Sequence, residues 1–289
     1  MLKPRVIAML PVLNGVVVQS YGFRQHLPVG KPEIAAEFLN SWGIDEIVCV
    51  DIRAGIRGDS VSPEMIQKVS SRCFAPLTAG GGINKIEQAD RLIHSGADKL
   101  CFNRIFFENP AFIKSIASKY GDQCVVISID ALKSENDWKV YDYASGTTRK
   151  ESLQESLKKA EDAGAGEIIL NAVHKDGSFE GFDIPMFQEA CRHVNVPLLA
   201  CGGARNGFDF VKLFKETSVS AGCAGNFFNF SEHSVNVTKK ILAESGIDIR
   251  IEVQSDYSEN QISPSARLLK KDEDALEQLL YVKIEKEVI

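Results

Sequence analysis

The stretch VVISID at residues 125–130 is a run of β-forming residues that ends on a carboxylate, Asp130. Apolar runs of this length, set between segments with helical periodicity, are typical of strands buried on both faces of a parallel sheet. A charged residue at the carboxyl end of such a strand faces the mouth of the sheet, where α/β folds place their chemistry. The run VIAMLP at residues 6–11 is similar, but Pro11 stands where the first run has its acid.

Strand-like runs of this kind alternate with amphipathic segments along most of the chain. The runs lie at 5–11, 46–52, 76–80, 98–103, 124–130, 167–172, 197–202 and 220–225. The amphipathic segments, with apolar residues three and four positions apart, lie at 32–42, 63–72, 86–95, 111–119, 153–163, 185–193, 208–216 and 233–244. Eight strand–helix alternations predict an α/β fold, a (β/α)8 TIM barrel over residues 1–251. Residues 138–143, followed by Ser145-Gly146, predict a small β-hairpin inserted after the fifth strand.

The two halves of the predicted barrel match each other at the strand ends. Pro11 matches Asp130 at a separation of 119, Asp51 matches Asn171 at 120, residues 78–84 match 200–206 at 122, and Asn103 matches Asn226 at 123. Four matches in the same order predict a barrel built from two duplicated half-barrels.

Composition excludes several classes of protein. A chain of 289 residues with 44% hydrophobic content can bury a large core, while a net charge of -6 and a pI near 5.5 argue against a nucleic-acid surface. No stretch approaches the length of a membrane span, and the N-terminus lacks the pattern of a signal peptide. The seven cysteines form no CxxC pair and mostly lie in apolar runs, which predicts buried reduced thiols in a cytoplasmic protein. The sequence indicates neither a metal site nor a cofactor.

Residues 252–289 form a C-terminal extension with a different composition. Residues 255–265 are polar and rich in turn formers, and residues 272–287 alternate charges with a few aliphatic side chains. This pattern predicts a linker followed by a short helix or strand that docks on the barrel or on a partner. A disordered, solvated tail is the alternative.

Two glycine pairs, Gly81-Gly82 and Gly202-Gly203, each follow a strand and precede a helix. Without a Cβ, such residues let backbone N–H groups approach an anion, and the following helix N-terminus favours negative charge. A tight turn is the alternative for either pair alone. Their repetition in both halves predicts a phosphorylated ligand with one phosphate held by each half.

Polar residues near these turns are candidates for the same site. Asn103 and Asn226 end the fourth and eighth strands and could add amide donors, or could cap the loops that follow. Asp176-Gly177 resembles an anion-binding turn.

Asp130 is the candidate general acid or base, because partial burial at the barrel mouth can tune its pKa. A structural carboxylate that holds a loop amide is the alternative. Asp51, Asp176 and His174 are also predicted to face the mouth, although an exposed loop histidine would be unremarkable in that segment.

Four charged residues begin strands one, two, four and six: Arg5, Glu46, Lys99 and Glu167. Barrel geometry predicts that they meet in one ring at the N-terminal end. From the residues alone, such a ring of alternating charge is a plug that contributes stability.

Residues 1–251 carry a set of motifs that together point to one family. They are RVIA at 5–8, Asp45-Glu46, Asp51-Ile52, GGGI at 80–83, GADK at 96–99, Asn103, Asn109-Pro110, IDA at 129–131, GAGEI at 164–168, Asp176-Gly177 and GGA at 202–204. With these motifs the chain resembles the cyclase subunit of imidazole glycerol phosphate synthase, the HisF family of histidine biosynthesis, whose fold is the duplicated barrel.

The resemblance implies a partner and a path for ammonia. A glutaminase subunit would dock at the N-terminal face and release ammonia, which would pass a salt-bridged gate and the barrel interior to a bisphosphate substrate. The gate matches Arg5, Glu46, Lys99 and Glu167, and Asp98 matches a partner-contacting acid. The glycine pairs and Asn103 match the phosphate sites, and Asp130 matches one of two catalytic aspartates.

The chain departs from the family at the reaction centre. Pro11 occupies the position of the other catalytic aspartate, and a proline cannot transfer a proton. The remaining departures are Leu13 and Gln19 for lysines, Asn171 and Ala172 for hydroxyl residues, Asn226 for a serine, and added charge at Arg53, Arg57 and Arg104.

Three functional hypotheses follow. The first is a divergent HisF-like subunit that delivers ammonia to a different acceptor, as in amidino-sugar formation for surface polysaccharides, alongside a separate sugar amidotransferase. The second is an active cyclase in which Asp51, Asp176 or His174 replaces the missing acid. The third is a non-catalytic scaffold that activates a glutaminase and docks partners through residues 255–289.

Overall fold

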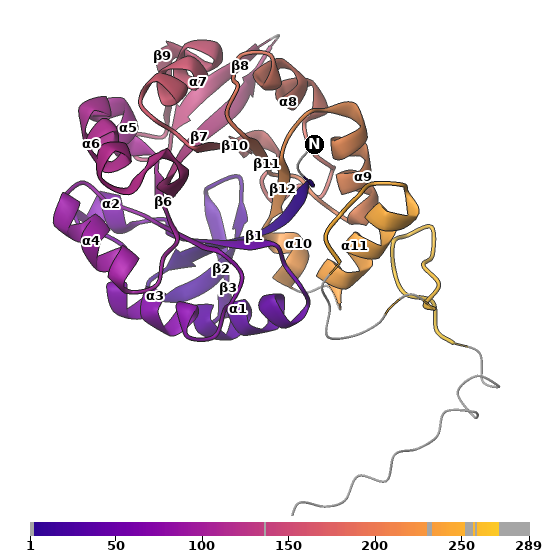
Figure 1. The fold of residues 1–289 in the computed structure, drawn as a ribbon. Helices are drawn as coiled ribbons and strands as arrows, with labels where there is room; N and C mark the ends of the chain where they lie inside the picture. The colour runs from indigo at the N-terminus through magenta and orange to yellow at the C-terminus, as the bar shows by residue number, and fades with distance from the viewer. Residues whose placement is uncertain (1–2, 136, 230–232, 252–256, 258, 272–289) are drawn as a thin grey trace, which may run out of the picture.

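The computed structural model describes residues 3–135, 137–229, 233–251, 257 and 259–271. Eight parallel strands form a closed barrel in which every neighbouring pair is hydrogen-bonded and β7 pairs with β10 to close the circle (Figure 1). The strands are β1 (Arg5–Leu13), β4 (Glu46–Asp51), β5 (Leu77–Gly80), β6 (Lys99–Phe102), β7 (Val125–Ser134), β10 (Glu167–Ala172), β11 (Leu198–Cys201) and β12 (Ala221–Ala224). The predicted (β/α)8 barrel is confirmed.

Within the described residues, eight longer helices surround the barrel, one between each pair of successive barrel strands and one after the last. They are α1 (Pro32–Ser41), α3 (Pro63–Ser70), α4 (Ile86–His94), α6 (Pro110–Tyr120), α7 (Leu153–Asp162), α8 (Ile184–Cys191), α9 (Gly207–Glu216) and α11 (Ser234–Glu244). Capping explains several of the boundaries, since Ser62 and Ser152 accept backbone N–H groups at the starts of α3 and α7. The predicted helical segments are confirmed to within about two residues at each end.

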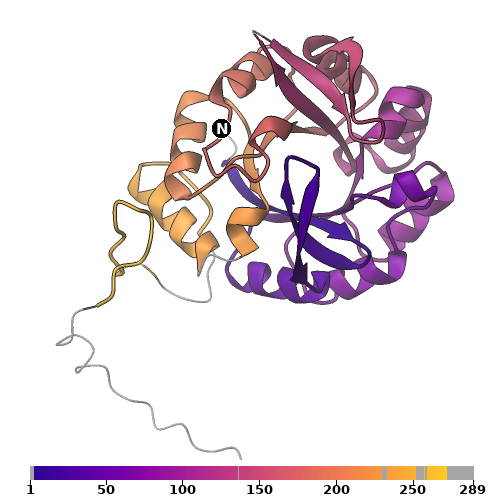
Figure 2. The ribbon, with the colours of Figure 1, turned by 180° about the vertical axis from the view of Figure 1, so that it is seen from behind.

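Two antiparallel hairpins extend from the C-terminal ends of barrel strands. The first consists of β2 (Val16–Tyr21) and β3 (Gln25–Gly30) after β1, and the second of β8 (Asp137–Asp142) and β9 (Thr147–Ser152) after β7. In Figure 2 the first hairpin, in indigo, lies across the mouth of the barrel. The sequence predicted only the second hairpin, because the exposed β3 contains Pro28 and lacks apolar alternation.

The structure corrects three of the four matches between the half-barrels, each by one residue. Pro11 pairs with Val50, and Asp130 pairs with Asn171. With Pro11 equivalent to Asp130, the equivalent of Asn171 is therefore Val50 and not Asp51, whose equivalent is Ala172. A one-residue slip in a strand moves a side chain to the opposite face, so only register could decide this.

The match of Asn103 with Asn226 is also displaced by one residue. Asn103 accepts the Phe106 N–H at the start of α5 (Arg104–Glu108), and Gly225 accepts the Phe228 N–H at the start of α10 (Asn226–Asn229), both at 3.0 Å. The structural equivalent of Asn103 is therefore Gly225, and that of Asn226 is Arg104.

The predicted match of residues 78–84 with 200–206 is displaced in the same way. Gly80 pairs with Cys101, and Cys201 pairs with Cys223. Gly81 is therefore equivalent to Gly202, and residues 78–84 match 199–205.

The barrel interior is apolar between its two ends. A cluster of inward side chains with almost no exposure includes Ile7, Val48, Val126, Ile169 and Leu199. A separate and larger core fills the space between the barrel and its helices. Five of the seven cysteines are buried, while Cys124 and Cys191 are partly exposed.

Only part of the C-terminal extension falls among the described residues. Ile262 and Leu268 form an isolated antiparallel bridge, so residues 259–271 make a turn-rich segment. The expected helix or strand at 272–287 lies outside the described residues, and so does most of the linker. Among the helices that the structure describes, none is long and apolar enough to cross a membrane.

Candidate functional site

A cavity of about 600 Å³ opens at the C-terminal ends of the barrel strands. This volume is typical of small-molecule sites. It is lined by most of the residues that the sequence proposed for ligand binding or proton transfer: Asp51, Gly81, Gly82, Asn103, Asp130, Asn171, Asp176, Gly177, Gly202, Gly203 and Asn226. The structure therefore brings residues from both halves of the chain to one site.

Asp130 is the most deeply buried acid of this cavity, with 3% of its surface exposed. Its two oxygens accept hydrogen bonds from the side-chain amides of Asn171, at 2.7 Å, and Asn103, at 2.8 Å. Burial raises the pKa of Asp130 to about 6, against the opposing effect of these two bonds. The carboxyl can thus exchange a proton near neutral pH, as a general acid or base must.

Pro11 lines the same cavity on β1, at the position equivalent to Asp130. Its ring offers neither a donor nor an ionisable group. The first half of the barrel therefore contributes no inward acid at the position where the second half contributes Asp130.

The two glycine turns have the backbone conformations that their predicted role requires. Gly81 and Gly82 have φ of 113° and 69°, and Gly202 and Gly203 have φ of 106° and 96°. A Cβ at Gly82 would lie 1.9 Å from the Asp59 carbonyl oxygen, so no other residue fits there without a shift.

Asn226 and Asp176 hold the β2–β3 hairpin. The Asn226 amide accepts the Ser20 N–H at 3.0 Å and donates to the Ser20 carbonyl at 2.7 Å. The Asp176 carboxylate accepts the Ser20 hydroxyl at 2.7 Å and the Phe23 N–H at 3.1 Å. Burial raises the pKa of Asp176, with these hydrogen bonds acting against it.

Replacing Asn226 with alanine is expected to release this hairpin. Two hydrogen bonds to Ser20 would be lost, each contributing about 0.5–1.5 kcal/mol, so the free energy of unfolding should fall by about 1–3 kcal/mol. Amide hydrogen exchange at Ser20 and Tyr21 should accelerate. Asn84→Ala is the control, because Asn84 lines the same cavity but its side chain forms no hydrogen bond within the described residues. If amide exchange at Ser20 and Tyr21 were unchanged in Asn226→Ala, Asn226 would not be what holds the β2–β3 hairpin.

Asp51 lines the cavity, but its carboxylate is already engaged. It accepts the N–H groups of Arg53 and Ala54, at 3.0 and 2.9 Å, and pairs with Arg57 at 2.7 Å. It therefore fixes the start of α2 (Ala54–Arg57) rather than presenting a free acid.

The prediction that His174 faces the mouth is wrong. His174 does not line the cavity; its Nε2 lies 2.7 Å from Asp183, and its Nδ1 accepts the Lys133 N–H. Asp183 also accepts the indole N–H of Trp138 at 2.9 Å. His174 therefore links the end of β7 to the start of α8, and it does not reach the site of the missing acid at Pro11.

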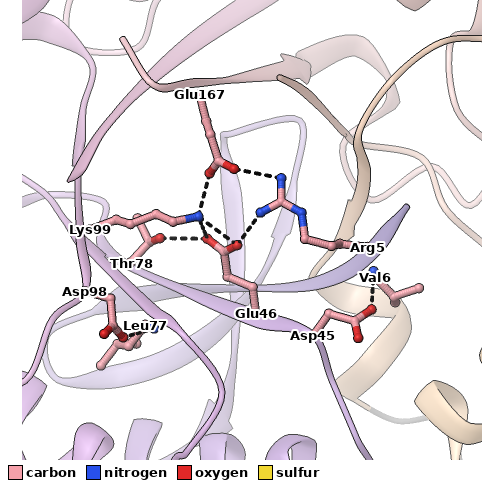
Figure 3. Close-up of polar contacts among 9 residues, drawn as sticks. All are labelled: Arg5, Val6, Asp45, Glu46, Leu77, Thr78, Asp98, Lys99 and Glu167. Carbon is pink, nitrogen blue, oxygen red and sulfur yellow. Dashed lines mark hydrogen bonds and ion pairs between the residues drawn. The ribbon is translucent and has the colours of Figure 1, made fainter. Parts of the chain in front are cut away.

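At the opposite end of the barrel, four charged side chains form the predicted ring (Figure 3). Arg5 bonds to Glu46 at 2.8 Å and to Glu167 at 2.7 Å. Lys99 bonds to the same two acids, at 3.0 and 2.7 Å. The ring is closed, because each cation contacts both acids, and Thr78 donates a further hydrogen bond to Glu46 at 2.9 Å.

Asp98 lies beside this ring on an exposed surface and accepts the Leu77 N–H at 2.8 Å. A contact between Asp98 and a partner stays a prediction. Within the described residues, no group of three or more His, Cys, Asp or Glu side chains could hold a metal ion.

Comparison with known proteins identifies the family. A family model described as "Histidine biosynthesis protein" matches residues 5–234, most of the chain. The chain belongs to this family. A protein of Vibrio vulnificus with the provisional name imidazole glycerol phosphate synthase subunit hisF2 is 35% identical over 261 residues, which cover 89% of this chain and 94% of that protein.

Two further relatives carry the HisF name itself. The imidazole glycerol phosphate synthase subunits HisF of Streptococcus gordonii and Pyrococcus furiosus are 37% and 36% identical over 255 and 252 residues, in each case 87% of this chain and the whole relative. The resemblance inferred from the motifs is confirmed, and this chain is a HisF-like protein.

Sequence reasoning missed several residues of the site. Tyr143 and His26 reach the cavity from the two hairpins, and Arg53 lines its wall. The sequence marked Arg53 only as a departure from the family. Burial, and secondarily the charge of Arg53, lower the pKa of His26. The hairpin positions of Tyr143 and His26 gave no motif signal.

Proposed function

We propose that this HisF-like chain receives ammonia from a glutaminase partner at the N-terminal end of the barrel and delivers it to a phosphorylated acceptor in the C-terminal cavity. The observation that carries the proposal is that three features follow one another along the barrel axis. The closed ring lies at one end, the apolar interior follows, and the cavity with Asp130 lies at the other end.

The interior suits ammonia rather than ammonium. An uncompensated charge between Ile7, Val48 and Ile169 would lose its hydration without gaining a partner, whereas neutral ammonia is a small molecule with a modest desolvation cost. The ring closes the path at rest, and movement of one cation away from an acid would open it.

We further propose that the acceptor differs from the imidazole precursor and belongs to amidino-sugar or surface-polysaccharide synthesis, with a separate sugar amidotransferase. Pro11 supports this, since the reaction centre lacks one inward acid. The relative named hisF2 gives precedent for a second HisF-type subunit beside the histidine enzyme.

The first test mixes the purified chain with a HisH-type glutaminase and measures glutamine hydrolysis and co-elution. Stimulated hydrolysis and a stable complex are expected. Absence of both would overturn the proposal. ¹⁵N-labelled glutamine would then distinguish acceptors, because the label should reach a sugar amidine and not an imidazole ring.

Phe74 is expected to anchor the partner. It lies in the loop that enters β5 at Leu77, on the same end as the ring, and 91% of its surface is exposed. Exposed aromatic residues at interfaces often contribute about 2 kcal/mol or more, so Phe74→Ala should weaken the complex by roughly 30-fold. Titration calorimetry or glutaminase stimulation would measure it.

Phe208→Ala is the matched control for Phe74→Ala. Phe208 is 42% exposed but lies in the first turn of α9, which follows β11 and so begins at the opposite end of the barrel. Its replacement should leave partner affinity unchanged. Equal effects of the two variants would argue against docking at the end that carries the ring.

A second candidate function is an active cyclase, and the position of Asp130, buried at the cavity where it matches a catalytic aspartate of the family, favours it. The test is growth of a histidine auxotroph that lacks the cyclase subunit. Growth would identify a cyclase that works without the acid at Pro11. No growth, followed by growth with Pro11→Asp, would indicate that this one position separates the two activities.

A further inference from the structure

The two ends of the cavity differ in charge although the barrel is duplicated. The corrected register makes Arg53 equivalent to His174 and Arg104 equivalent to Asn226. Both arginines line the cavity. In the second half His174 is turned toward Asp183, and Asn226 is neutral. Arginine side chains therefore line the cavity at one end only. The acids Asp51 and Glu108 line that end as well, but each is already paired with an arginine, Asp51 with Arg57 and Glu108 with Nε of Arg104.

The positive end is built around the first glycine turn. Gly55 packs against this turn, since a Cβ on Gly55 would lie 3.5 Å from the Cα of Gly82 and 3.3 Å from the Tyr143 hydroxyl. Arg53 precedes Gly55 by two residues, and its backbone is fixed by its N–H bond to Asp51. Among the residues that the structure describes, Arg53 has no ion-pair partner.

Arg104 retains donors for a ligand. Its Nε bonds to Glu108 at 2.6 Å, and its two terminal nitrogens form no hydrogen bond within the described part of the chain. A guanidinium presents these donors in a planar fork that matches phosphate oxygens.

The second glycine turn has a different environment. A Cβ on Gly203 would lie 3.1 Å from Cβ of Lys175, but the Lys175 ammonium pairs with Glu180 at 2.9 Å and does not line the cavity. The polar side chains that line this end include Ser20, Asn226 and the acid Asp176. A dianionic phosphate would gain less here than beside two guanidinium groups.

We propose that the cavity binds an asymmetric ligand whose negative charge is concentrated at one end, a phosphoanhydride held by Gly81, Gly82, Arg53 and Arg104. The other end of the ligand, beside Gly202 and Gly203, carries no phosphate. This inference rests on the proposed function in one respect, that the cavity is the acceptor site. It names the class of acceptor as diphosphate esters, in contrast to molecules with one phosphate at each end.

The test titrates the full chain with inorganic pyrophosphate and with orthophosphate, by calorimetry and without a glutaminase. One pyrophosphate should bind per chain, at least about 10-fold more tightly than orthophosphate. Arg53→Gln should weaken pyrophosphate binding by about 10- to 100-fold, because a charge-assisted bidentate contact is lost. Arg53→Lys should recover part of the loss, since it keeps the charge without the fork.

Arg205→Gln is the matched control. Arg205 follows the second glycine turn, carries the same charge and does not line the cavity, so its replacement should leave pyrophosphate affinity unchanged. The proposal would be overturned if two orthophosphates bound per chain with similar affinity. It would also be overturned if Arg53→Gln and Arg205→Gln weakened pyrophosphate binding equally. Because the readout needs no glutaminase, its failure is distinct from failure of ammonia transfer.

Discussion

Replacing Lys239 with methionine is expected to lower the free energy of unfolding by about 3–5 kcal/mol, because it leaves a buried carboxylate without its counter-charge. The side chains of Lys239 on α11 and Asp45 before β4 are 2% and 5% exposed, and their charged atoms lie 2.5 Å apart. The other oxygen of Asp45 accepts the Val6 N–H at 2.8 Å. Denaturant unfolding at pH 7 would measure the loss.

This ion pair lies directly behind the ring at the N-terminal end. Asp45 precedes Glu46, and Val6 follows Arg5, so the pair fixes the backbone on both sides of one ring contact. Lys239→Met should therefore also reduce stimulation of a glutaminase, even at temperatures where the barrel stays folded. The double variant Lys239→Met with Asp45→Asn should regain part of the stability, since no charge then remains buried.

Lys240→Met is the control for this prediction. Lys240 is the neighbouring residue on α11, and it pairs with Glu244, whose side chain is 56% exposed and so remains hydrated when the lysine is removed. Its replacement should therefore cost less than that of Lys239, whose partner is buried. If Lys239→Met cost no more than Lys240→Met, the buried pair would not be a determinant of stability.

The barrel was predictable from sequence because its signal is repeated and local. Each strand is a short apolar run, each helix has apolar residues at three- and four-residue spacing, and caps such as Ser152 mark the boundaries. The ring was predictable for the same reason. Arg5, Glu46 and Lys99 each begin a parallel strand, and strand starts meet at one end of a barrel.

Side-chain partners were not predictable, because they depend on contacts between distant segments. Nothing near His174 in the sequence distinguishes a residue at the cavity from one bonded to Asp183 and Lys133. The hydrogen bond between Ser20 and Asn226 joins residues that are 206 positions apart in the sequence. The sequence shows that the two half-barrels match, but it does not fix the match to the exact residue. That required the strand pairings, in which Val50 lies beside Pro11 and Asn171 lies beside Asp130.

Asp130→Asn is expected to abolish most turnover of the acceptor while making the protein more stable at pH 7. Loss of a general acid or base typically costs about 100- to 10,000-fold, and the first half of the barrel offers no second acid at Pro11 to compensate. Consumption of the phosphorylated acceptor, supplied with ammonium salt, measures this loss without a glutaminase. Unchanged turnover would exclude Asp130 from proton transfer.

The sign of the stability change follows from the raised pKa of Asp130. With a pKa of about 6 in the folded chain and 3.8 as the ordinary value, the folded state holds its proton more tightly. Stability therefore falls as the pH rises from about 4 to about 6, by up to about 3 kcal/mol. The Asp130→Asn variant would avoid this loss, although the new amide can accept only one of the two hydrogen bonds from Asn103 and Asn171, which subtracts about 1 kcal/mol.

Asp142→Asn separates a functional acid from a structural one. Asp142 lies on β8 and pairs with Arg149 at 2.8 Å, and it does not line the cavity. The same substitution there removes an ion pair, so stability should fall slightly while turnover stays unchanged. If Asp130→Asn raises stability and abolishes turnover, while Asp142→Asn lowers stability and leaves turnover unchanged, Asp130 acts in catalysis and destabilises the folded protein. A loss of stability in Asp130→Asn at pH 7 would instead assign Asp130 to holding the loop after β6 and the end of β10.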